Sequence, residues 1–457
     1  MRKFLLLISD IFALYAALWL TLFIRYNFNF REQIAFHLVP FSILFLFFLF
    51  IFYTSNLYEI SSLRNGQDFY GTFSRAMMGS AFAGIVYFYL LPFWRIAPRR
   101  NLFLFLILFS VLDFGLRILF NRAISSKKLR KPAIIVGFNS QSLQLAGFLK
   151  KNPQLGYQLE GVFDISEGLD KEESSEFNVI KNITQFKNEI ETKHVNTVII
   201  SPEAYKLQHM TETFYQLIRR KINFYSLGSF YEKISQRVLL DDVNQIWFLE
   251  NLSEGSKKLY EVGKRLSDLV FAVVFGIAAL VLTPFVALAI KLNSSGPVFF
   301  RQTRVGQLGK HFKIIKFRTM VADSKDGGAE GGTGAVWAQE NDPRVTRVGK
   351  FLRRTRLDEL PQLWNVLKGE MSLVGPRAER PEFQGELEKS MPFYEERYLI
   401  KPGLTGWAQI KYRYGSSVKD AAEKLQYDLF YIKHRSLILD LSIVLKTINI
   451  VIRQAGR

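Results

Sequence analysis

Four long apolar runs fill the first part of the chain, and polar residues separate them. The runs are Phe4–Ile24, Ala35–Tyr53, Phe73–Leu91 and Leu102–Phe120. Each is close to the roughly 20 residues that a helix needs to cross a bilayer. The first run has no clear small-residue cleavage site and three similar runs follow it, which favours an uncleaved span over a signal peptide. The pattern therefore predicts four transmembrane helices within residues 1–125.

Basic residues beside these runs set the expected orientation. Arg2 and Lys3 precede the first run, and a larger basic group follows the fourth, made of Arg122, Lys127, Lys128, Arg130 and Lys131. An even number of spans puts both groups on one side, which the positive-inside rule makes cytoplasmic. Arg95, Arg99 and Arg100 in the opposite loop argue against this, but they are fewer. Asp10 and Asp113 lie inside runs, where a functional role and a packed, hydrogen-bonded role are equally open.

From residue 130 to residue 250 the pattern becomes that of a soluble α/β domain. The expected strands are Ala133–Val136, Gly161–Asp164, Thr197–Ile200 and Ile222–Tyr225, with a helix over Ser142–Lys151. Such alternation is typical of a doubly wound, Rossmann-like sheet. The dinucleotide-binding signature would need glycine where Asn139 and Ser142 stand. A regulatory or oligomerising role is therefore favoured over cofactor binding in this domain.

A fifth apolar run, Leu269–Ile290, separates this domain from the C-terminal part. Its hydropathy favours a fifth span. Pro284 interrupts the helical hydrogen bonding in its second half, and Lys264, Arg265 and Lys291 put positive charge at both ends. The residues alone leave two alternatives open, a true span and a segment that enters the membrane and returns.

Composition adds charge to this picture. The chain has a formal charge of +19, 15% aromatic residues and 42 phenylalanines, which indicates a membrane protein whose soluble face meets anionic lipid or an anionic substrate. Nucleic acid is the rival partner for a basic chain, but no nucleic-acid module accompanies the charge. The chain has no cysteine, which excludes disulfides and thiolate chemistry, and its five histidines are scattered.

Candidate chemistry is concentrated between Asp342 and Arg377. Asp358 and Glu359 directly follow four basic residues, Lys350, Arg353, Arg354 and Arg356. Glu359–Leu367 suits a short helix that Gly369 ends, which would place Asp358 at the N-cap. A helix N-terminus with arginines also forms an anion site, where a carboxylate can attack phosphorus. Local physics allows both the capping role and the catalytic role.

Several motifs resemble one family in their order. They are Lys316–Met320, Arg353–Arg377 and Lys401–Trp407, and together they look like the bacterial sugar transferases, the monotopic phosphoglycosyl transferases. The resemblance covers about Lys257–Arg457. It implies an α/β catalytic domain over residues 257–457, with a re-entrant helix at about 266–292 whose break falls at Thr283 and Pro284. The expected location is the cytoplasmic face of a bacterial inner membrane.

The resemblance also implies a reaction and roles for residues. A sugar-1-phosphate would pass from a UDP-sugar to undecaprenyl phosphate, releasing UMP and starting exopolysaccharide assembly. Asp358 would be the nucleophile, Glu359 a general base, and Mg2+ would bridge Asp358 and the diphosphate. Lys316, Arg318 and Arg353 would bind the anionic substrates. Pro376 and Arg377 match a Pro-Arg-Pro motif linked to the uridine side, although Ala378 replaces the second proline.

Other expectations concern the rest of the C-terminal part. Pro297–Gln302 and Phe312–Phe317 alternate like two strands, Asp326–Gly334 suits a flap over the site, and Leu437–Ile452 suits a helix in the membrane interface. The sequence names neither the sugar nor the assembly, for which a homo-oligomer is open. The rival functions are a membrane sensor with a ligand-binding α/β domain and a non-catalytic C-terminal part, and a multi-span transferase with its site between helices.

Overall fold

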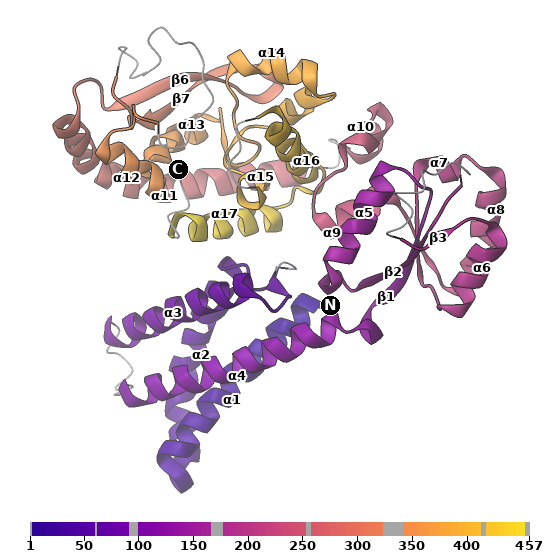
Figure 1. The fold of residues 1–457 in the computed structure, drawn as a ribbon. Coiled ribbons are helices and arrows are strands. Elements are labelled where there is room, and N and C mark those ends of the chain that lie inside the picture. The colour runs from indigo at the N-terminus through magenta and orange to yellow at the C-terminus, as the bar shows by residue number, and fades with distance from the viewer. Residues whose placement is uncertain are drawn as a thin grey trace. The chain divides into compact units, whose positions relative to one another are not determined.

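The chain folds into two compact units, Met1–Phe230 and Tyr231–Arg457, in a computed structural model (Figure 1). The structure describes residues 2–59, 62–90, 99–165, 177–252, 257–322, 342–412 and 417–452. The expected flap at Asp326–Gly334 lies outside the described residues. Each unit is described by itself below.

The first unit begins with four helices at the predicted apolar runs. They are α1 (Arg2–Tyr26), α2 (Phe30–Thr54), α3 (Gln67–Leu90) and α4 (Arg99–Ser125). Helices satisfy their own backbone groups, which is what an apolar run needs in a lipid environment. The core between them is rich in phenylalanine, and the rings of Phe105 and Phe109 stack with centroids 5.8 Å apart. The prediction of four N-terminal helices is confirmed.

Asp10 and Asp113 are packed polar residues in this bundle. Arg117 lies between them, with its NH2 2.5 Å from Asp10 Oδ2 and its Nε 3.0 Å from Asp113 Oδ2. The hydroxyl of Tyr58 also donates to Asp10 Oδ2, over 2.6 Å. The Arg117–Asp10 pair joins α4 to α1, and the Arg117–Asp113 pair lies within α4. Of the two roles left open by the sequence, direct contacts therefore support the packed one.

The α/β domain completes the first unit. Its strands are β1 (Lys131–Val136), β2 (Tyr157–Phe163), β3 (Val179–Ile180), β4 (Thr197–Ile200) and β5 (Asn223–Ser226), and its helices are α5 (Ser140–Lys151), α6 (Ile183–Thr192), α7 (Pro202–Tyr205) and α8 (Gln208–Leu217). The sheet has the order β3-β2-β1-β4-β5, and every pair is parallel. Figure 1 shows α5 on one side of the sheet and α6 and α8 on the other. The predicted doubly wound sheet is therefore confirmed.

The second unit carries the C-terminal motifs. After α9 (Leu227–Ser235), which spans the border, it contains α10 (Gln245–Asn251), α11 (Lys258–Asn293), β6 (Phe299–Val305), β7 (His311–Phe317), α12 (Arg347–Thr355), α13 (Leu363–Lys368), β8 (Ser372–Val374), α14 (Pro381–Ser390), β9 (Gly403–Thr405), α15 (Trp407–Lys411), α16 (Val418–His434) and α17 (Leu437–Ile452). The two predicted strands form the antiparallel pair β6-β7, and the predicted C-terminal helix is α17. Pro376 and Arg377 follow β8, which pairs in parallel with β9.

The segment 231–251 packs within the second unit. Val238 N donates to Gln426 O over 3.1 Å, and the indole Nε1 of Trp407 donates to Gln236 O over 3.0 Å. The carboxylate of Glu232 lies 2.9 Å from Lys433 Nζ. This segment therefore belongs structurally with the C-terminal domain.

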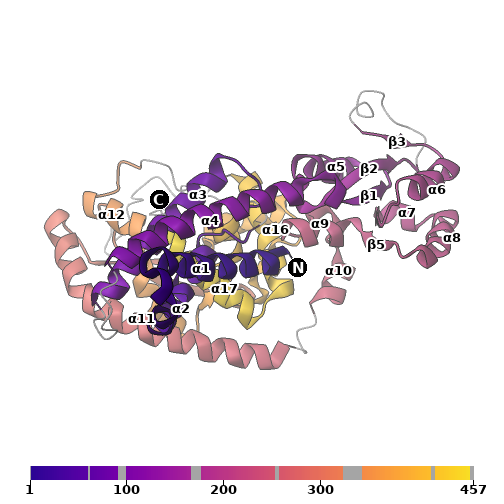
Figure 2. The same ribbon diagram turned by 90° about the horizontal axis from the view of Figure 1, so that it is seen from below.

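Helix α11 is the long apolar helix of the second unit. With α1, α2 and α4 it is one of the described helices long and apolar enough to cross a membrane. We expected a break at Thr283 and Pro284, but the backbone stays helical through both residues, and Figure 2 shows one helix that bends toward its C-terminal end. Thr283 Oγ1 donates to Ala279 O over 2.8 Å beside the site where Pro284 lacks its N–H. The re-entrant course of α11 stays a prediction.

Candidate active site

The turn that carries Asp358 and Glu359 follows α12. Thr346 caps the start of α12, because its Oγ1 accepts from Gly349 N over 2.9 Å. The helix ends when Arg356 takes a left-handed conformation, with φ 59° and ψ 13°. A 3-10 helix then runs over Leu357–Gln362 and leads into α13. Gly369, in a left-handed conformation with φ 83°, ends α13 as predicted.

The predicted N-cap role of Asp358 is wrong. The residue before the 3-10 helix is Arg356, so Asp358 lies inside the first turn and not at its cap. Its side chain is buried, and its Oδ1 has no hydrogen-bond partner among the described residues. A carboxylate oxygen that is buried and unpaired is costly, so this geometry favours a functional role over a structural one.

Glu359 is in the opposite situation, since three cationic groups surround its Oε1. Lys316 Nζ lies 3.2 Å away, Arg356 NH1 lies 3.5 Å away and Arg377 NH2 lies 3.5 Å away. These groups come from β7, from the end of α12 and from the loop after β8. Glu359 therefore joins three segments of the domain at one point.

The two neighbouring carboxyl groups have pKa values displaced in opposite directions. Burial raises the pKa of Asp358 to about 6, and the charge of Glu359 adds to the rise. Burial also acts to raise the pKa of Glu359, but Lys316, Arg377 and Arg356 together outweigh it and lower this pKa to about 2. Near neutral pH both are ionised, and Asp358 keeps a buried oxygen without a hydrogen-bond partner among the described residues.

Asn365 is a site residue that the sequence analysis missed. Its Nδ2 donates to Lys313 O over 2.8 Å, and its Oδ1 accepts from Ile315 N over 3.3 Å. These bonds fix α13, and with it the turn of Asp358, against the strand that carries Lys316. A buried asparagine in a short apolar helix was the available signal, but its partners lie about 50 residues away in the sequence.

The remaining predicted residues divide between this group and other places. Arg353 Nε donates to Thr319 Oγ1 over 2.9 Å, and its charge acts to lower the pKa of Asp358. Arg318 NH2 donates to Ser294 O over 2.8 Å, so this buried guanidinium holds the carbonyl end of α11. Pro376 O accepts from Gly403 N over 2.8 Å. Thr283 and Pro284 belong to α11, a different element from the turn that carries the carboxyl pair.

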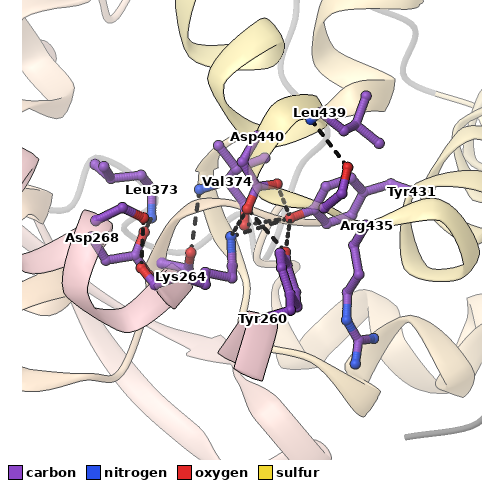
Figure 3. Close-up of polar contacts among 12 residues, drawn as sticks. Tyr260, Lys264, Asp268, Leu373, Val374, Tyr431, Arg435, Leu439 and Asp440 are labelled. Atoms are coloured by element: carbon purple, nitrogen blue, oxygen red, sulfur yellow. Dashed lines mark hydrogen bonds and ion pairs between the residues drawn. The ribbon is translucent and has the colours of Figure 1, made fainter. Parts of the chain in front are cut away.

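A buried polar cluster fixes the first turns of α11 to the rest of the second unit (Figure 3). Asp440 of α17 accepts hydrogen bonds from Tyr260, Lys264 and Tyr431, over 2.9, 2.9 and 2.7 Å. One turn further along, Asp268 Oδ1 accepts from Leu373 N of β8 over 3.0 Å. Since β8 leads directly to Pro376 and Arg377, the cluster connects the apolar helix to the loop of the candidate site.

The residues present fit a magnesium ion better than a zinc ion. The described residues contain no group of three or more acidic or histidine side chains that could enclose a metal. Mg2+ is usually held by one or two carboxylates, with phosphate and water oxygens completing the shell. The unpaired Oδ1 of Asp358 suits that arrangement.

Comparisons with known proteins find relatives that match the part of the chain carrying Asp358 and Glu359. The family model described as "Bacterial sugar transferase" matches residues 259–454, which include all of the carboxyl and cationic groups above. The chain is 40% identical over 238 residues to the UDP-N-acetylgalactosamine-undecaprenyl-phosphate N-acetylgalactosaminephosphotransferase of Aeromonas hydrophila, a match that covers 51% of this chain and 53% of that protein. It is 34% identical over 339 residues to the undecaprenyl-phosphate glucose phosphotransferase of Komagataeibacter xylinus, covering 71% and 59%.

A third relative is matched over more of its length. The chain is 30% identical over 385 residues to the UDP-galactose-lipid carrier transferase of Erwinia amylovora, which covers 79% of this chain and 77% of that protein. The chain thus spans only between half and two thirds of the first two relatives, but over three quarters of the third. With this coverage and the family match over the domain of Asp358 and Glu359, the chain belongs to the bacterial sugar transferase family.

Proposed function

We propose that this protein transfers a sugar-1-phosphate from a UDP-sugar to undecaprenyl phosphate and releases UMP, as a phosphoglycosyl transferase that starts the assembly of a bacterial polysaccharide. The observation that carries the proposal is the carboxyl pair. Asp358 is buried, ionised near neutral pH and has an unpaired oxygen, while Glu359 beside it gathers three cations. Relatives named for three different sugars leave the transferred sugar open.

The proposed reaction has two displacements at one phosphorus atom. Asp358 attacks the phosphorus that carries the sugar, an aspartyl oxygen–phosphorus bond forms, and the bond from that phosphorus to the bridging oxygen of UMP breaks. After UMP leaves, a phosphate oxygen of undecaprenyl phosphate attacks the same phosphorus and the Asp358 carboxylate is released. The product is the lipid diphosphate sugar, and the kinetics are ping-pong.

The surrounding residues would bind and orient the anionic groups. Arg353 lies close enough to act on the charge of Asp358, and Arg377 and Lys316 extend the positive field on the side of Glu359. A pKa of about 2 makes Glu359 a weak base near neutral pH, so we assign it to holding the cations in place of the general base expected from the sequence. Arg318 would support the site indirectly, through the end of α11.

Mg2+ would be held by Asp358 together with the diphosphate of the donor, and it would spread the negative charge that develops at phosphorus. The unpaired Oδ1 of Asp358 supports this assignment.

The proposed site lies at a membrane surface on the cytoplasmic side of the inner membrane. A water-soluble donor and a lipid acceptor can meet only there. The apolar stretch of α11 supports this, because its side chains, such as Leu280 and Phe285, are largely exposed and need lipid to cover them. Exposed Ile438 and Leu441 on α17 extend the apolar surface.

A membrane sensor with a non-catalytic C-terminal part remains the alternative. It gives no reason for an unpaired, buried carboxylate beside a cation-bound one. The test is turnover by the purified full chain in detergent, with undecaprenyl phosphate and a panel of radiolabelled UDP-sugars. We expect one donor to be converted and an acid-quenched reaction without acceptor to contain protein heavier by one phosphosugar. D358N should give neither product nor adduct. Turnover by D358N would refute the covalent mechanism, and a chain inactive with every donor would refute the function.

A further inference from the structure

The loop that carries Arg377 is held at four successive carbonyl groups. Pro376 O accepts from Gly403 N over 2.8 Å, and Glu379 O accepts from Val305 N over 2.9 Å. Between them, Arg377 O accepts from Arg397 NH2 over 3.1 Å, and Ala378 O accepts from Arg304 NH1 over 3.1 Å. Two of the four donors are therefore arginine side chains, which no repeating backbone structure requires.

These hydrogen bonds hold the loop at the position where a Pro-Arg-Pro motif would have its second proline and this chain has Ala378. Ala378 follows Arg377 directly, and an alanine leaves φ free where a proline would fix it. The loop has to hold Arg377 with its NH2 3.5 Å from Glu359 Oε1. The hydrogen bond from Arg304 to the carbonyl of Ala378 restrains the backbone at this same residue.

Arg304 is an unusual choice for a purely structural bond. It projects from β6, and its NH2 donates to Gln302 Oε1 over 2.7 Å, while its Nε has no hydrogen-bond partner among the described residues. Burial lowers its pKa to about 10, and Arg377 and Arg380 add to the decrease against the opposing charge of Glu379. A half-buried guanidinium beside other cations costs stability, which favours a functional role for Arg304 over a purely structural one.

Arg397 is more firmly paired. Its NH2 lies 2.9 Å from Asp428 Oδ2 and its NH1 lies 3.4 Å from Glu379 Oε1. Removal of Arg397 would leave the buried carboxylate of Asp428 without its ion-pair partner, which strongly destabilises a fold. Arg304 is therefore the better residue for an experiment on the loop.

We propose that Arg304 and Arg397 are positioning residues that hold the backbone of residues 376–379, so that Arg377 is kept in place for the UDP-sugar donor. The inference rests on the proposed function, in which Arg377 binds the donor. A substitution of Arg304 should therefore weaken donor binding and leave acceptor binding unchanged.

The experiment compares R304M with the wild-type full chain in detergent. Loss of a hydrogen bond from a charged donor should raise the KM for the UDP-sugar and the Kd for UDP, the probe for calorimetry, by about tenfold. The KM for undecaprenyl phosphate should stay within about twofold, because this acceptor enters after UMP has left. R304K keeps a cationic donor and should recover part of the loss.

Two further variants separate positioning from general stability. A378P in the R304M background should restore much of the donor affinity, because proline limits the backbone that Arg304 no longer holds. K257M is the control, since Lys257 Nζ also donates to backbone carbonyls, Ile432 O over 3.2 Å and Lys433 O over 3.1 Å, but outside both the loop and α13. It should lower the melting temperature and leave the donor KM unchanged.

The outcomes are distinguishable. An active wild type whose R304M variant keeps its donor KM and UDP affinity would overturn the inference alone. Equal losses for donor and acceptor, or no restoration by A378P, would reduce Arg304 to a purely structural residue and also overturn it. A wild type that is inactive with every donor would overturn the proposed function together with the inference.

Discussion

The substitution D358N should abolish turnover and at the same time stabilise the protein. Asp358 is only 8% exposed, and its Oδ1 has no partner among the described residues. Its folded-state pKa of about 6 lies above its ordinary value of 3.8, so the folded protein binds the proton more tightly than the unfolded chain does. Stability is therefore lost as pH rises through this window, and the full cost is present above about pH 6.

The size of the cost follows from the displacement of the pKa. A rise from 3.8 to about 6 corresponds to about 3 kcal/mol, at about 1.4 kcal/mol per pKa unit. Asparagine has nearly the same shape and carries no charge, so it should recover a large part of this free energy. For a domain of this size, 3 kcal/mol corresponds to a rise of roughly 5–10 °C in melting temperature.

The adjacent residue provides a matched control of opposite sign. Glu359 is also 8% exposed, but its pKa is lowered from 4.5 to about 2. Its pairing therefore stabilises the fold above about pH 4.5, and this contribution is lost as pH falls through about 2. E359Q should lower the melting temperature near neutral pH, because three cations would lose their common counter-charge.

Thermal unfolding of the full chain in detergent, followed by tryptophan fluorescence, measures both effects. The advantage of D358N over the wild type should be largest near neutral pH and should disappear near about pH 4, where Asp358 is protonated. A melting temperature of D358N equal to or below that of the wild type at neutral pH would refute the reasoning. The carboxylate would then be stabilised by its surroundings and not held at a cost.

Three further predictions follow from the same structure. The turnover rate should fall about tenfold per pH unit below the pKa of Asp358, about 6. In E359Q the activity that remains should fall only at lower pH, because the charge of Glu359 no longer raises the pKa of Asp358. A pH profile of E359Q equal to that of the wild type would exclude Asp358 as the titrating group. Residues 231–457 should form an active fragment. Residues 257–457 should melt at a lower temperature, because they lack the segment that contacts α15 and α16. Equal melting temperatures of the two fragments would contradict this. In the cysteine-free chain, an impermeant thiol reagent should label S294C only after the inner face of the membrane is exposed, and labelling of intact cells would indicate that α11 crosses the bilayer.

The sequence predicted the secondary structure well where one physical requirement dominates. The apolar runs of α1 and α4 have to be helical in lipid, and the Val- and Ile-rich strands β1 and β4 are buried on both faces of their sheet. The antiparallel pair β6-β7 was readable from alternation in the same way. In these elements each residue's preference agrees with its surroundings.

Within the candidate site, the sequence predicted which residues to consider but not the local geometry around them. Asp358 and Glu359 were singled out together as candidate residues. The prediction that Asp358 is an N-cap was wrong, because Arg356 takes a left-handed conformation that the neighbouring residues do not predict. The role of Arg318 depends on carbonyls 23 and 24 residues away, and that of Arg304 depends on a carbonyl 74 residues away. Such contacts exist only after the strands and helices have assembled.

The difference between the pKa values of Asp358 and Glu359 is a consequence of this assembly. In an isolated turn, adjacent acidic residues would share the same solvent and have similar pKa values. The fold instead brings Lys316, Arg356 and Arg377 from three segments to Glu359, and it leaves an oxygen of Asp358 buried without a donor. The cations keep Glu359 ionised, and its charge raises the free energy of the neighbouring carboxylate. In the proposed mechanism this would leave Asp358 reactive toward phosphorus. Under this proposal Glu359 would act on the reaction through the pKa of Asp358 and the positions of the three cations.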